Sequence, residues 1–213
     1  DTAPAAYGWN VVNSSWTGPQ FLAQSKNGGA DQTKANGWVQ KNVAAKIMAA
    51  GGQDLTKAMV AAKTKGFKAV PLGLKAGVSF ENAISKKNSR NIVGVLKGTK
   101  RPDEYVLYTG HWHHLGRCTP VAGDEICNGA VDNATGTAAL VALAEAHKKA
   151  GAPDRSIVFL AVTAEESGLL GSKYYAENPI YPLSKTVGGV NMDAFSMSGP
   201  AKNLTVIGMG KSD

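Results

Sequence analysis

Residues 156–163, SIVFLAVT, are apolar at nearly every position, and this run constrains the fold more than any other feature of the chain. A strand with one face in water alternates apolar and polar residues, whereas a strand that is covered on both faces does not. The run is too short to span a membrane, and no other apolar run approaches the roughly 20 residues that a span needs. The sequence therefore predicts a sheet that is buried on both faces and no membrane span.

Further strand-like runs alternate with helical patterns in the second half of the chain. Strands are expected at residues 91–96 and 105–109, which the polar loop KGTKRPDE would join as a hairpin, and at residues 186–192 and 203–209. Helices are expected at residues 134–149 and 167–177. Buried strands that alternate with helices are typical of α/β folds. We therefore predict an α/β domain with a mixed, largely parallel sheet between helices.

The beginning of the chain has a different character. Residues 1–36 are rich in Gly, Asn and Ser without a clean periodicity, and we treat them as an irregular segment that precedes a domain at 37–213. Helical spacing begins after Gly37, and a second short helix is expected between Asp54 as its cap and Gly66 as its stop. Strands are also expected at residues 67–74 and 76–80.

Charge is unevenly distributed along the chain. Residues 1–100 contain 14 lysine and arginine residues against 4 acidic residues, whereas residues 101–213 contain 9 against 12. The lysines alternate with Ala, Gly and Asn, which is typical of a solvated surface, and an anion-binding face is the alternative. Nucleic-acid binding usually needs more arginine with interleaved aromatic residues, and Arg90 is the one arginine in this half. This composition argues against a nucleic-acid partner.

The two cysteines, Cys118 and Cys127, lie in the turn-rich stretch RCTPVAGDEIC. Their spacing favours a loop disulfide, which would stabilise the fold by roughly 2–3 kcal/mol in the chain-entropy model. Two unrelated free thiols are the alternative. A disulfide would imply an oxidising compartment, so the expected location is secreted or periplasmic.

Ionisable side chains follow the carboxyl ends of the apolar strands, where ligands bind in open α/β sheets. They are His111, His113 and His114 after one strand, Glu165 and Glu166 after a second, and Asp193 after a third. Asp132 lies in the turn that opens the long helix. Each carboxylate alone also has an ordinary interpretation, as a helix cap, a solvated first turn or a loop contact. Together these nitrogen and oxygen donors suit zinc or a similar divalent ion.

The adjacent glutamates suggest a division of roles. One carboxylate would bind the metal while its neighbour takes a proton from a water that the metal activates. His147 is different, because it lies in the last turn of the long helix, where we expect an interaction with the helix dipole.

Four motifs, in this order, carry a family resemblance: YTGHWHHLG, CNGAVDNATGTAAL, VTAEESGLLGS and VNMDAF. They resemble the co-catalytic zinc aminopeptidases, a family that includes bacterial leucyl aminopeptidases, aminopeptidase Y and glutamate carboxypeptidase relatives. The resemblance covers about residue 91 to the end. It implies two zinc ions, hydrolysis of an N-terminal peptide bond, and a peptide or aminoacyl substrate. The first residues resemble the tail of a protease-associated domain.

The same resemblance implies a role for each site residue. His111 and Asp193 would be ligands of separate zinc ions, and Asp132 would bridge the two. Glu166 would be a ligand of the second ion, and Glu165 would be the general base.

Two departures from the family pattern bear on activity. The family's first motif reads His-x-Asp, but position 113 is His, whose neutral imidazole could accept a hydrogen bond from His111 without supplying a negative charge. Loss of such a supporting carboxylate typically costs 10- to 100-fold in metal affinity or activity.

The family also has a last histidine ligand, whereas this chain has no histidine beyond His147. We therefore expect a domain that is incomplete at its C-terminus and at most one tightly held zinc. A partner chain that completes the site is one alternative. A non-catalytic binding domain on the same fold is another.

Overall fold

The structure is a computed structural model, and it describes residues 8–15, 18–30, 32–195, 199–200, 202–203 and 205–208. The chain divides into two compact units. The first unit comprises Asp1–Gln20 and Gln24–Lys87, and the second comprises Phe21–Ala23 and Asn88–Asp213. This division differs from the boundary at residue 36 that the sequence suggests, and the strand-rich part begins only after Lys87.

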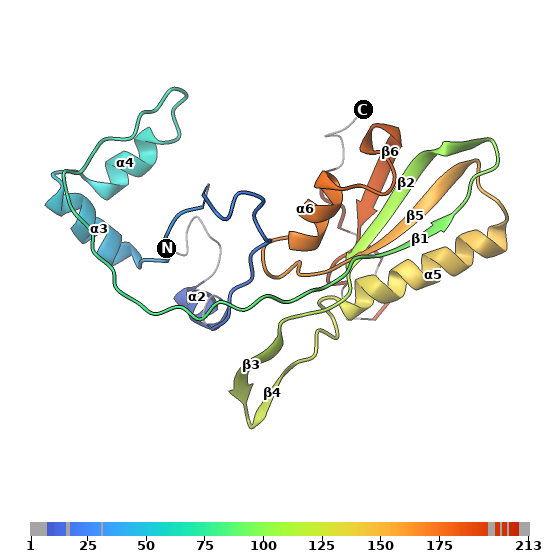
Figure 1. Cartoon of the computed structure of the whole chain (residues 1–213), viewed down its shortest axis with the longest axis horizontal. Helices are drawn as coiled ribbons and strands as arrows, with labels where there is room; N and C mark the ends of the chain where they lie inside the picture. Colours follow the sequence, from blue (N-terminus) through green and yellow to red (C-terminus); the bar gives the residue numbers. More distant parts are fainter. Residues whose placement is uncertain are drawn as a thin grey trace. The chain divides into compact units, whose positions relative to one another are not determined.

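The apolar run at residues 156–163 forms strand β5, Arg155–Val162, inside a four-stranded sheet of the second unit (Figure 1). The strand order is β1-β5-β2-β6, where β1 is Ile92–Leu96, β2 is Arg101–His111 and β6 is Thr186–Asn191. Strand β2 runs parallel to β5 and to β6, and β1 runs antiparallel to β5. The expected mixed, largely parallel sheet is confirmed.

Alternate side chains of β5 pack against different helices. Leu160 and Val162 form a buried cluster with Tyr175 of helix α6, Leu170–Glu177. Phe159 points to the opposite face, where its ring lies near His147 of helix α5, Ala134–Ala150. The two helices therefore cover opposite faces of the sheet, as the sequence predicts, and Figure 1 shows α5 running along it.

The hairpin expected between residues 91–96 and 105–109 is wrong. Strands β1 and β2 do not pair with each other, because β5 lies between them. The connecting loop instead crosses the start of β5, where the backbone N–H of Gly98 donates to Ser156 Oγ at 3.0 Å. A Cβ atom at Gly98 would lie 2.5 Å from the backbone of Arg155, so this crossing requires glycine. To be buried, β5 needs a neighbouring strand on each side. A hairpin of β1 and β2 would have provided it with only one of these neighbours.

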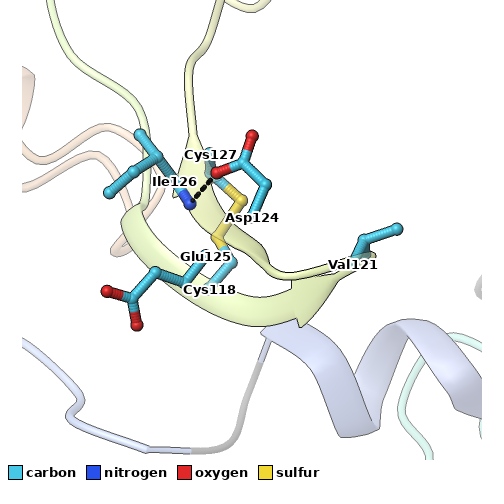
Figure 2. A pocket seen from close by; sticks show the side chains of 6 residues that line it. All are labelled: Cys118, Val121, Asp124, Glu125, Ile126 and Cys127. Atoms are coloured by element: carbon cyan, nitrogen blue, oxygen red, sulfur yellow. Dashed lines mark hydrogen bonds between the residues drawn. A yellow bond between two sulfur atoms is a disulfide. The ribbon is translucent and has the colours of Figure 1, made fainter.

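A second, two-stranded sheet follows β2. Strands β3, Gly116–Val121, and β4, Asp124–Cys127, form an antiparallel hairpin that the Cys118–Cys127 disulfide closes. Figure 2 shows the six residues that line a pocket on this hairpin, with the N–H of Ile126 donating to Asp124 Oδ1. No candidate metal ligand lines that pocket. The expected disulfide is confirmed.

The first unit has three helices among its described residues. They are α2, Trp9–Ser15; α3, Lys41–Ala50; and α4, Leu55–Ala61. Asp54 caps α4 as predicted, because its Oδ1 accepts from the N–H of Lys57 at 2.8 Å. The strands expected at residues 67–74 and 76–80 are wrong, since these residues form neither helix nor strand. Their side chains favour strands, but among the described residues no strand pairs with them.

The last predicted strand, at residues 203–209, falls partly outside the described residues. Its described members, Asn203 and residues 205–208, are not in a strand. A short 3-10 helix, Leu183–Lys185, precedes β6. Among the residues that the structure describes, no helix is both long enough and apolar enough to cross a membrane.

Candidate metal centre

Three parallel strands bring the predicted site residues to one edge of the sheet. His111 is the last residue of β2, Glu165 and Glu166 follow β5, and Asp193 follows β6. Since parallel strands end at the same edge, these side chains gather there. Asp132 reaches the same edge from the loop that leads into α5.

His111 lies at the centre of this group. Its side chain is 2% exposed, and its Nε2 atom lies 3.0 Å from Asp132 Oδ1 and 3.2 Å from Asp193 Oδ1. An oxygen of Glu165 lies 4.0 Å from the same nitrogen. The Nδ1 atom is 2.9 Å from the backbone carbonyl of His113, so Nδ1–H donates there and Nε2 faces the carboxylates. Metal-binding histidines are commonly held in this way.

The donor set fits a divalent metal ion. Ligand atoms of His111, Asp132 and Glu166 all lie within 4.8 Å of one another. Across the described part of the chain, no lysine or arginine forms an ion pair with the carboxylates of the site. Within the described residues, several carboxylates around one imidazole therefore have no lysine or arginine partner. A dication would supply the missing charge, and nitrogen and oxygen donors are those that zinc accepts.

The electrostatics of the site are visible in two shifted pKa values. Burial lowers the pKa of His111, but the His113 carbonyl and the carboxylates of Asp193 and Glu165 outweigh it, so the pKa lies above 6.5. Burial raises the pKa of Glu165; His111 opposes this, and the neighbouring carboxylates add to it. A carboxyl group with a raised pKa holds a proton more readily, which suits a group that must accept one and release it.

His113 supports His111 through its backbone and not through its side chain. The imidazole that the sequence places against His111 instead turns towards the end of β5. Its Nε2 atom accepts from the N–H of Ala164 at 2.7 Å and lies 2.9 Å from Thr163 Oγ1, while Nδ1 lies 2.9 Å from the His114 carbonyl. The expected side-chain contact is therefore wrong, because these neighbours satisfy both ring nitrogens.

His114, the third histidine of the motif, contacts a different site residue. Its Nδ1 atom lies 2.5 Å from Glu166 Oε1. The sequence places His114 at the correct edge of the sheet but does not indicate this partner.

Asn133 belongs to the candidate site, and the sequence does not indicate its role there. Its side chain, 2% exposed, caps α5 by accepting from the N–H of Gly136 at 2.9 Å. It also donates to the carbonyl of Met192 at 2.9 Å and accepts from the N–H of Ala194 at 3.2 Å. Asn133 thereby joins the segments that carry Asp132 and Asp193. Its position directly after Asp132 is the signal that could have suggested this link.

Gly136 allows these segments to approach each other closely. A Cβ atom there would lie 2.4 Å from the carbonyl oxygen of Met192 and 2.3 Å from Asn133 Oδ1. Glycine at this position therefore lets the first turn of α5 lie against the end of β6.

Comparison with known proteins finds relatives that match part of this chain. Aminopeptidase NAALADL1 of Rattus norvegicus is 34% identical over 129 residues, which cover 58% of this chain and 16% of the relative. A probable zinc metalloprotease of Pyrenophora tritici-repentis (strain Pt-1C-BFP) is 39% identical over 99 residues, 46% of this chain and 22% of the relative. The chain thus spans less than a quarter of the length of either relative.

Among solved structures, BSAP, a zinc aminopeptidase from Bacillus subtilis, aligns with a TM-score of 0.38 and 30% identity. That alignment covers 49% of this chain and 24% of BSAP. The family model described as peptidase family M28 matches residues 91–213, which is more than half of the chain and contains every residue of the candidate metal centre. The chain therefore belongs to peptidase family M28.

Proposed function

We propose that this chain carries the zinc site of a metallopeptidase that hydrolyses the N-terminal peptide bond of its substrate. The observation that carries the proposal is the pair of carboxylate oxygens 3.0 and 3.2 Å from the buried Nε2 atom of His111. Membership of peptidase family M28 supports the reaction class, and the name of the rat relative, an aminopeptidase, supports the choice of the N-terminal bond.

In this proposal His111, Asp132, Glu166 and Asp193 hold the metal. When bound, a zinc ion lowers the pKa of water towards neutrality and polarises a carbonyl group. Asp132 and Asp193 are suited to coordination because each lies against His111 Nε2 without a lysine or arginine partner among the described residues. Asn133 keeps the segments that carry these two aspartates together.

Glu165 is proposed as the general base. Its carboxylate takes a proton from the attacking water while the water oxygen bonds to the carbonyl carbon. It returns the proton to the amide nitrogen as the C–N bond breaks, so the products are a free amino acid and a shortened peptide. The raised pKa of Glu165 supports this role, since the group must hold the proton between the two steps.

The disulfide supports a location outside the cytoplasm. Disulfides such as Cys118–Cys127 persist in oxidising compartments and are rare where thiols are kept reduced. We therefore propose that the protein is secreted or periplasmic and acts on peptides there.

The adjacent glutamates provide the experiment. Glu165→Gln should abolish turnover of an aminoacyl 4-nitroanilide and leave the zinc content nearly unchanged, because it removes the base but no ligand. Glu166→Gln should reduce the bound zinc, measured by elemental analysis after dialysis. Glu145→Gln is the matched control, since Glu145 pairs with Lys149 on the exposed side of α5. Equal zinc loss from Glu165→Gln and Glu166→Gln would refute the assignment of roles.

A further inference from the structure

The contact between His114 and Glu166 is not used by the proposed mechanism. The side chains are 20% and 21% exposed, and His114 Nδ1 lies 2.5 Å from Glu166 Oε1. Both atoms are shielded from solvent, and neither forms a hydrogen bond within the described part of the chain. A buried polar atom without a partner is costly, and the distance of 2.5 Å places these two atoms within hydrogen-bond reach of each other.

His114 contacts two neighbouring residues besides Glu166. Its carbonyl group accepts from His113 Nδ1 at 2.9 Å, and Gly129, from the loop before α5, lies against its side chain. A Cβ atom at Gly129 would be 2.5 Å from the Cβ atom of His114. The loop that leads to Asp132 therefore packs against the side chain of His114.

Glu166, in contrast, is poorly supported by its own segment. It lies in the turn between β5 and α6, outside any helix or strand. Among the residues described, no lysine or arginine pairs with it, and His114 is the one side chain in an ion-pair contact with it. A ligand on a turn needs a fixed partner if it is to stay in place when the metal is absent.

We propose that His114 is a positioning residue for Glu166. The Nδ1–H group of His114 donates to Glu166 Oε1 and holds the carboxylate in place to bind the metal. The inference rests on the proposed function, because it takes Glu166 as a metal ligand. Supporting partners of metal ligands typically contribute 10- to 100-fold in metal affinity. His114 would thus contribute to metal affinity without contacting the metal.

Two variants separate this role from a general effect on folding. In His114→Asn the side-chain amide can replace Nδ1, because both groups are bonded to Cγ, whereas in His114→Gln the amide lies one bond farther out. Zinc affinity of the metal-stripped chain is measured by competition with a chromophoric chelator. His114→Gln should lose roughly 10- to 100-fold in affinity. His114→Asn should remain much closer to the original chain.

The same titration in a Glu166→Gln background tests whether His114 acts through Glu166. There, His114→Gln should cause little further loss of affinity, because the carboxylate that it positions is already gone. Losses that multiply in the double variant would overturn the proposal, and so would equal losses in His114→Asn and His114→Gln. Unchanged affinity in His114→Gln, with zinc still bound by the original chain, would refute this inference alone. An original chain that binds no zinc would refute the proposed function as well.

Discussion

Replacing Asn133 with alanine removes three hydrogen bonds that tie the start of α5 to the segment after β6. The side chain accepts from Gly136 N and Ala194 N and donates to the Met192 carbonyl, at distances of 2.9, 3.2 and 2.9 Å. Because Asn133 is 2% exposed, water cannot easily reach the groups left behind. Asn133→Ala should therefore destabilise the fold and separate Asp132 from Asp193.

The size of the effect follows from these contacts. Loss of a side-chain N-cap costs about 1 kcal/mol. Each of the other two bonds contributes about 1 kcal/mol net, and more if its partner stays buried without a replacement. We expect the free energy of unfolding to fall by about 3 kcal/mol. With a denaturant slope of about 2 kcal/mol per molar urea, the unfolding midpoint should fall by about 1.5 M.

Urea unfolding of the metal-stripped chain, followed by circular dichroism, measures this shift. Asn178→Ala is the matched control, because the side chain of Asn178 makes one exposed hydrogen bond, to the Tyr174 carbonyl at the end of α6. That variant should change the stability by no more than about 0.5 kcal/mol. Zinc affinity should also fall in Asn133→Ala and not in Asn178→Ala. Equal midpoints for the two variants would refute the structural role assigned to Asn133.

Three further outcomes are expected. Because the pKa of His111 lies above 6.5 in the folded chain, its protonated form stabilises the metal-free fold. The contribution of His111 to the free energy of unfolding is complete below about pH 6.5 and is lost as the pH rises through the raised pKa. The raised pKa of Glu165 likewise makes the metal-free fold more stable at low pH. Zinc competes with the His111 proton, so zinc affinity should fall about tenfold per pH unit below that pKa, and a flat profile over pH 5.5–8.5 would contradict the assignment. His113→Asp should give no tenfold gain in zinc affinity at neutral pH, because the support for His111 Nδ1 comes from the backbone carbonyl, which the substitution keeps. The double variant Cys118→Ser, Cys127→Ser should lose about 2–3 kcal/mol of stability, and two freely alkylated thiols in the unreduced, unfolded chain would show that the bridge does not form.

Much of the second unit could be predicted because its inner strand β5 is buried along most of its length, although β1 and β6 are largely exposed. The run at β5 and the helix at α5 carry their signals in hydrophobicity, which does not depend on the rest of the fold. The pairing of strands, in contrast, depends on the rest of the fold. Nothing in residues 91–109 indicates that β5 would separate β1 from β2, and the apolar residues at 67–80 found no strand to pair with.

The candidate site divides in the same way. Residues at the carboxyl ends of strands could be predicted to gather, because parallel strands share an edge. The contacts of His113, His114 and Asn133 could not be predicted, because they depend on which way each side chain turns within a loop. The histidine at position 113 looks damaging by its chemistry. Its side chain nevertheless makes hydrogen-bond contacts with Thr163 and Ala164 and not with His111.

Zinc titration of the metal-stripped chain at neutral pH tests the metal centre most directly, with His111→Gln as the test variant and His147→Gln as the control. His147 lies in the last turn of α5, with its ring near Tyr108 and Phe159, away from the carboxylates that surround His111. We predict that the original chain and His147→Gln each retain one tightly bound zinc per chain after dialysis, and no more, with equal affinity. His111→Gln should retain none. The absence of retained zinc in the original chain, or equal retention in His111→Gln, would contradict the proposed metal centre.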